Sequence, residues 1–75
     1  MQNKIFTILD KQETAEHIAK KATKEKAIKQ INMAQELYHL AVIELVNGND
    51  YELPILFADR LTSRASRATF FNNLI

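Results

Sequence analysis

The chain has 75 residues, which allows one domain but leaves little interior in which a deep catalytic pocket could be sheltered. It contains no Cys, which excludes disulfides and thiolate metal sites as sources of stability. With 47% hydrophobic residues and no Trp, its apolar content is mainly Ala, Ile and Leu, which favours packed helices and argues against disorder.

The net charge of +1 conceals a segregation of charge along the chain. Residues 1–29 carry seven Lys and four acids, residues 30–59 carry five acids and no Lys or Arg, and residues 60–75 carry three Arg and no acid. Such segregation more often lets parts of one fold, or two subunits, attract each other than it marks a ligand site.

The first eleven residues, MQNKIFTILDK, hold too short an apolar stretch for a secretory signal, and no run approaches the ~20 apolar residues of a membrane span. We therefore expect a cytoplasmic protein with no membrane partner. Asp10 followed by Glu13 has the spacing of a capping box, which predicts a helix start near residue 11. Residues 1–9 are accordingly expected to form an N-terminal segment before the first helix.

No Gly or Pro interrupts the chain before Gly48, so residues 10–46 are predicted to be one long helical region. Within it the apolar stripe lapses around Thr23, in the stretch KKATKEKA, and resumes at Ala27. This pattern predicts either a kinked helix or two helices with a tight join. A straight rod would be ~55 Å long, too long for a compact chain of this size.

The stretch LYHLAVIELV, residues 37–46, is apolar on nearly every side. The polar stripe of this helix consists of Lys29, Asn32, Glu36 and His39. A helix that is apolar all round must be buried all round, and the rest of so short a chain can cover only part of it. We therefore expect a homodimer. The predicted self-association residues are Leu37, Leu40, Ala41, Ile43 and Leu45.

Residues 47–50 are predicted to form a corner, with Gly48 free to take the left-handed conformation that ends a helix. Asp50 is expected to cap the last helical region, residues 51–73. Residues 62–66 are rich in Ser and Thr and are a candidate break in this region. The fold class is thus all-α: residues 1–75 form a single small helical bundle in which the C-terminal helix packs back antiparallel.

The spacing of Glu36 and His39, Glu-x-x-His, puts a carboxylate and an imidazole on one helix face, as the carboxylate metal sites of helical bundles require. Both residues fall on the polar stripe, so we expect no metal and no cofactor. Ser63 and Ser66 lack the context of a nucleophile elbow, and the chain has no Gly-rich phosphate loop. We therefore expect that the protein is not an enzyme.

Arg60, Arg64 and Arg67 fall within ~60° of one another on a continuous helix. Like charges at this spacing repel, so something must neutralise them. The candidates are the acidic middle segment of this or a neighbouring subunit, an acidic protein partner, and phosphates. The charge segregation favours pairing within the fold. Hydroxyl donors to phosphate could come from Ser63, Ser66 and Thr69.

The segment ADRL, residues 58–61, followed by SRATFF, residues 66–71, resembles the second and third helices of helix-turn-helix regulators. Residues 66–71 are similar to the recognition helix of the TetR family. The resemblance implies that this helix enters the major groove while its aromatic residue packs against the helix before it. The turn, residues 62–65, would be about two residues longer than in that family. A second partial match spans residues 18–31.

We expect a non-enzymatic protein-binding module, a small cytoplasmic inhibitor or adaptor. Compact, Lys- and Asn-rich, Cys-free helical proteins of this kind are similar to the accessory proteins of phages and mobile elements, which is an analogy of class. The alternative is a nucleic-acid-binding regulator that uses the C-terminal Arg helix. Exposed arginines beside Ser66 and Thr69 would favour nucleic acid, whereas arginines paired with the acids of residues 36–52 would favour protein binding.

Overall fold

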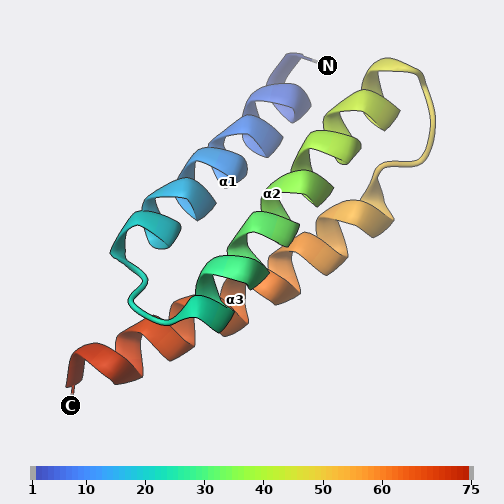
Figure 1. Cartoon of the computed structure of the whole chain (residues 1–75). Helices are drawn as coiled ribbons and strands as arrows, with labels where there is room; N and C mark the ends of the chain where they lie inside the picture. The colour runs from blue at the N-terminus through green and yellow to red at the C-terminus, as the bar shows by residue number, and fades with distance from the viewer. Residues whose placement is uncertain (1, 75) are drawn as a thin grey trace.

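The computed structural model describes the backbone of residues 2–74 and the side chains of residues 4–67. It contains three helices, α1 (Gln2–Lys21), α2 (Glu25–Val46) and α3 (Glu52–Leu74), and no strand within this range (Figure 1). The predicted all-α bundle is confirmed. None of these helices combines the length and the apolar character that crossing a membrane requires.

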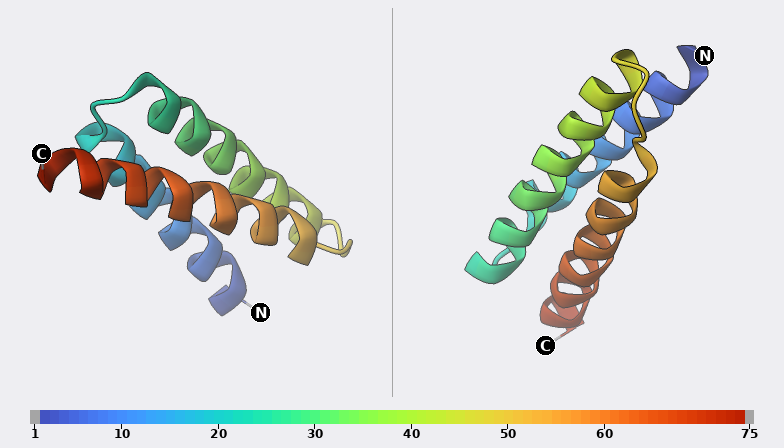
Figure 2. Two further views of the ribbon diagram at one scale, coloured as in Figure 1. Left: turned by 90° about the horizontal axis from the view of Figure 1, so that it is seen from below. Right: turned by 90° about the vertical axis from the view of Figure 1, so that its right-hand side faces the viewer.

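α2 is the middle element of the bundle. It packs along both neighbours, whereas α1 and α3 touch over a shorter stretch. The N-terminus and the α2–α3 connection lie at one end of the molecule, and the α1–α2 join and the C-terminus lie at the other (Figure 1). Figure 2 shows α3 running back along α2 in both further views. One flank of α2 is therefore covered by α1 and the other by α3.

The join between α1 and α2 occupies residues 22–24, where the apolar stripe shifts phase. The backbone N–H of Ala22 donates to the carbonyl of Ala19 at 3.2 Å, and the N–H of Ile28 donates to the carbonyl of Lys24 at 3.1 Å. The predicted long region is thus two helices with a tight join, and the kinked single helix is wrong. Each helix can now direct its own apolar face at the core.

The start of α1 differs from the prediction. The helix begins at Gln2, so residues 2–9 are helical and Asp10 lies inside α1. Ile8 is buried against the core, which holds this first part of the helix in place. The carbonyl of Asp10 accepts a hydrogen bond from the hydroxyl of Thr14 at 2.9 Å, as in a helix interior. Burial of an apolar residue therefore outweighs the capping-box spacing.

The end of α2 is as predicted. Gly48 has a φ of +78°, and its N–H donates to the carbonyl of Leu45 at 3.1 Å. The N–H of Asn49 donates to the carbonyl of Glu44 at 2.8 Å, which completes a Schellman motif. At the start of α3, the N–H of Glu52 donates to Oδ1 of Asp50 at 3.0 Å, so the predicted cap is confirmed.

α3 has no break at residues 62–66. The hydroxyl of Thr62 donates to the carbonyl of Ala58 one turn earlier, at 2.8 Å. This bond satisfies the hydroxyl within the helix, so the Ser- and Thr-rich stretch can remain helical. The three arginines of α3 consequently lie on one continuous helix.

The core is built mainly from alanine. Six of the nine buried hydrophobic residues among residues 4–67 are Ala. On α2 the buried positions follow an alternating spacing of four and three residues, and they are Ala27, Ile31, Ala34, Tyr38 and Ala41. Small side chains let helices approach closely but bury little apolar area per residue. The result is a thin molecule of 45 × 17 × 13 Å.

A polar cluster crosses the middle of the bundle. The hydroxyl of Tyr38 on α2 donates to Oδ1 of Asp59 on α3 at 2.7 Å. Nζ of Lys11 on α1 lies 2.9 Å from Oδ2 of the same carboxylate. Burial raises the pKa of the Tyr38 hydroxyl to about 12, and the bond to Asp59 adds to the shift against an opposing effect of Thr62. One carboxylate thus ties all three helices and orients α3.

Candidate functional site

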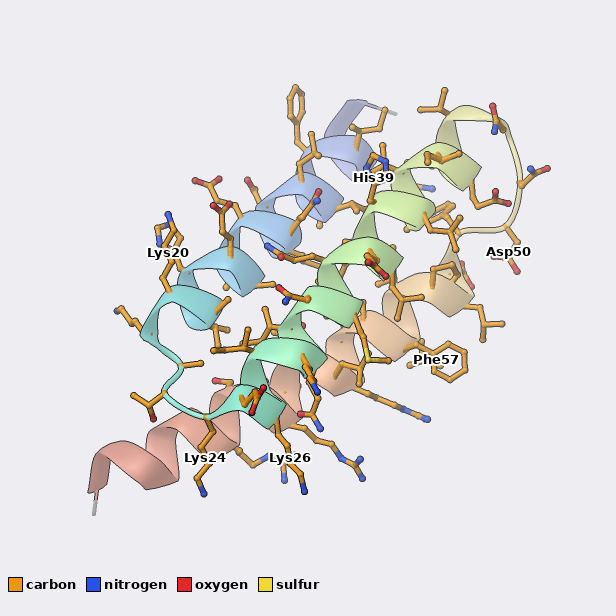
Figure 3. All side chains as sticks on the ribbon, viewed as in Figure 1. Lys20, Lys24, Lys26, His39, Asp50 and Phe57 are labelled. Carbon is orange, nitrogen blue, oxygen red and sulfur yellow. The ribbon has the colours of Figure 1, made fainter. Side chains whose placement is uncertain are left out.

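A groove of about 690 Å³ lies between α2 and α3. Its apolar lining consists of Met33, Leu37, Leu56, Phe57 and Leu61. Its polar lining consists of Asp59, Arg60, Ser63, Arg64 and Arg67. Figure 3 shows Phe57 projecting from α3 on the side turned away from α1. We call this feature the α2–α3 groove.

Apolar side chains in the groove remain open to solvent. Met33 is 54% exposed, Leu56 47% and Phe57 46%. Leu53 lies one turn before Phe57 on α3, and Leu40 lies seven residues after Met33 on α2, so both continue the same faces. They too are exposed. Single exposed apolar residues are ordinary on protein surfaces, whereas here several of them line one groove.

The arginines form the basic end of the groove. Arg60, Arg64 and Arg67 are exposed, and the ion pairs in the described part of the chain involve other residues. The predicted pairing with the acids of residues 36–52 is therefore wrong. Because α3 runs antiparallel to α2, its arginines lie toward the Lys-rich start of α2, where Figure 3 labels two of the lysines. Most of those acids lie toward the opposite end.

Two of the three predicted hydroxyl donors, Ser63 and Ser66, separate on α3. Ser63 lines the groove with the arginines. Ser66 is exposed but does not line it, because two residues beyond Arg64 the helix has turned by about 200°. The structure thus places Ser63, but not Ser66, beside the arginines in the groove, and a role of either serine in binding stays a prediction. The side chains of Ala68, Thr69 and Phe71 lie outside the described residues.

The predicted self-association residues also separate. Ala41 is fully buried inside the chain, and Leu45 is half-buried against the same core. Neither is available to a second subunit in the way the sequence suggested, since the middle helix of a bundle uses two of its sides internally. Leu37 lines the groove, while Leu40 and Ile43 remain 43% and 41% exposed.

Glu36 and His39 lie on the other flank of α2. Both are exposed, in a polar depression shared with Asn32, Gln12 and Gln35. Nε2 of Gln35 donates to the carbonyl of Gln12 at 3.5 Å. Among the described residues, no three His, Asp or Glu side chains gather as a metal site would require.

The backbone does not have helix-turn-helix geometry at either matched segment. α3 continues through residues 62–65, so the segments 58–61 and 66–71 share one helix instead of crossing at a turn. The second match, residues 18–31, spans the join of α1 and α2, but these helices run side by side as an antiparallel hairpin (Figure 1). The implied entry of a short recognition helix into the major groove has no counterpart in this backbone.

Of the apolar lining of the groove, the sequence singled out Leu37 alone. Phe57 shares a helix face with Leu61, yet it lies at the open edge of that face and remains exposed. The signal was present as a second stripe on α3, formed by Leu53, Leu56, Phe57, Arg60 and Arg64 at spacings of three, four and seven residues. No known protein family, curated protein or solved structure matches this chain.

Proposed function

We propose that this protein is a small, non-enzymatic protein-binding module whose docking surface is the α2–α3 groove. The groove takes a helical segment that carries apolar side chains beside carboxylates. In this proposal the module acts in the cytoplasm as an inhibitor or adaptor, the role that its class-level likeness to accessory proteins of phages and mobile elements suggests.

The observation that carries this proposal is the juxtaposition of unpaired arginines and half-exposed apolar side chains. Arg60 and Arg64 line the same groove as Met33, Leu56 and Phe57. Aromatic residues, Met and Arg are the types enriched at protein interfaces. The apolar face of a partner helix would cover Met33, Leu56 and Phe57. Carboxylates on the same helix would neutralise the two arginines through bidentate hydrogen bonds.

Nucleic acid is the second candidate partner. The exposed, unpaired arginines favour it, because phosphates could neutralise them together with nearby lysines of α2. Phosphates would leave Met33, Leu56 and Phe57 uncovered, however, and the continuous α3 removes the helix-turn-helix basis for reading DNA. The apolar half of the groove therefore supports a protein partner over nucleic acid.

Two synthetic helical peptides test the proposal. Both carry Leu at heptad positions a and d, and the remaining positions are Glu-rich in one and Lys-rich in the other. In fluorescence anisotropy with the protein near 1 µM, we expect the Glu peptide to bind at least about tenfold more tightly. Phe57→Ala and Arg64→Ala should each weaken this binding, whereas Lys21→Ala on α1 should not. Equal binding of both peptides, or none, would contradict the proposal.

A further inference from the structure

We infer that a second copy of this chain occupies the α2–α3 groove when no other partner is present, and that the two copies pack antiparallel through α2. This inference rests on the proposed docking role of the groove. It names the occupant from two observations: the register of charges on α2 and the area left exposed.

One side of α2, which includes the groove residues Met33 and Leu37, has a near-palindromic pattern. Lys29, Met33, Leu37, Leu40 and Glu44 fall within about 80° of one another around the helix. Measured along the helix axis, Lys29 and Glu44 each lie about 11 Å from the point between residues 36 and 37. Met33 and Leu40 each lie about 5 Å from the same point. An antiparallel copy centred there places each Lys29 opposite the other copy's Glu44. It also places each Met33 opposite Leu40.

Lys29 and Glu44 are available to form ion pairs with a second copy. Lys29 is exposed and Glu44 is half-buried, and neither takes part in the ion pairs of the described residues. In a two-fold interface a contact of one residue with another is made twice, so the dimer gains two Lys29–Glu44 pairs. A parallel copy would instead bring Lys29 onto Lys29 and Glu44 onto Glu44. Repulsion therefore selects the antiparallel orientation.

The exposed area is of the size that a dimer needs. The chain exposes 5548 Å². A folded monomer of 8.6 kDa is expected to expose about 4,700 Å², so the excess is about 850 Å². A standard interface buries about 800 Å² on each partner. The elongated bundle thus exposes more surface than a compact chain of its mass, by an amount similar to one partner's share of a standard interface.

Sedimentation equilibrium of the full chain tests the inference, at 1–100 µM protein and about 150 mM salt, a range that spans typical specific association. We expect a dimer of the 8.6 kDa chain to form within this range. Glu44→Lys and Lys29→Glu should each weaken it at least about tenfold, because each puts like charges in contact. The double variant Lys29→Glu/Glu44→Lys restores opposite charges and should recover the dimer.

Glu16→Lys on α1 is the matched control, since it changes the net charge as Glu44→Lys does but lies on another helix. Circular dichroism confirms that each variant is folded, and recovery in the double variant excludes simple misfolding of the single ones.

A monomer at 100 µM, or a dimer indifferent to both single changes, would overturn the inference. If the chain stays monomeric while the Glu peptide still binds, the proposed function stands and only the second-copy occupant fails. If a charge-dependent dimer forms but the peptide does not bind, the second-copy occupant stands and the proposed binding of an acidic helix fails.

Discussion

The phenolic oxygen of Tyr38 lies 2.7 Å from Oδ1 of Asp59, which joins the middle of α2 to the middle of α3. The same carboxylate receives Lys11 from α1, so one side chain holds all three helices. In a core made mostly of alanine, few shape differences fix how one helix lies against another. This polar contact supplies that specificity, and it sets which face of α3 carries the arginines outward.

Tyr38→Phe removes the hydrogen bond while keeping the ring in the core. Because the acceptor is a charged carboxylate, we expect the free energy of unfolding to fall by about 1.5–3 kcal/mol. Urea denaturation measures the change. Tyr51→Phe is the control, since Tyr51 is only half-buried and its ring lies 5.6 Å from Nζ of the exposed Lys4. A loss for Tyr38→Phe no larger than for Tyr51→Phe would show that the contact contributes little.

The raised pKa of Tyr38 makes a prediction about alkaline pH. Its folded value of about 12 exceeds the ordinary value of 10.0, so the folded state favours the neutral phenol. The stabilisation is complete below about pH 10 and is lost as the pH rises toward about 12. The stability difference between the parent chain and Tyr38→Phe should shrink over this interval. A difference that stays constant from pH 9 to 12 would argue against a buried, hydrogen-bonded phenol.

Arg64 should contribute to binding but not to folding. It is exposed and takes part in no ion pair of the described residues, so Arg64→Ala should change the free energy of unfolding by less than about 0.5 kcal/mol. Thermal and urea unfolding at matched low protein concentration check this, because dimer formation would otherwise add to the apparent stability. A larger loss in the monomer would restore the idea that the arginines are neutralised within the fold.

Gly48 should be hard to replace. Its φ of +78° lies in the left-handed region, and a Cβ added there would meet no atom within 4 Å. The cost of Gly48→Ala is therefore conformational, about 1–2 kcal/mol, and not steric crowding. Gly48→Asn should cost less, because Asn visits this region more readily. Equal stability of all three chains would mean that the corner tolerates another backbone path.

Binding to duplex DNA separates the two candidate partners. We expect dissociation constants weaker than about 1 µM at about 150 mM salt, as for non-specific binding. If all three arginines contacted phosphates, the logarithm of affinity would fall with the logarithm of salt at a slope of about −2.7, and Arg64→Ala would reduce that slope by about one. Sequence-dependent submicromolar binding would favour the nucleic-acid function over protein binding.

The sequence predicted those features that local chemistry determines. Gly48 and Asp50 marked the corner and the cap, and the lapse at Thr23 marked the join, because each rests on backbone preferences of a few residues. The start of α1 could not be read in this way, since it depends on Ile8 finding a place in the core. In the apolar stretch of residues 37–46, some positions are buried and others exposed. Which ones are buried depends on where α1 and α3 pack, and a local sequence pattern does not contain that information.

The site was only half predictable for the same reason. The spacing of the arginines along α3 was enough to place them on one face. The sequence alone could not show whether acidic residues lie opposite that face, because this depends on the antiparallel direction of α3 beside α2. That direction sets the arginines toward the Lys-rich start of α2 and leaves Phe57 and Met33 lining one open groove.

The central claim is that the α2–α3 groove is a docking surface for an acidic, apolar helix. Two-dimensional ¹H–¹⁵N NMR of the labelled protein, titrated with the Glu-rich peptide at low protein concentration, tests it most directly. We expect backbone amide shifts to change along one side of the bundle, at Met33, Leu37, Phe57 and Arg64, while those of His17 and Lys20 on α1 stay fixed. Shifts confined to α1, or spread evenly over all three helices, would contradict it.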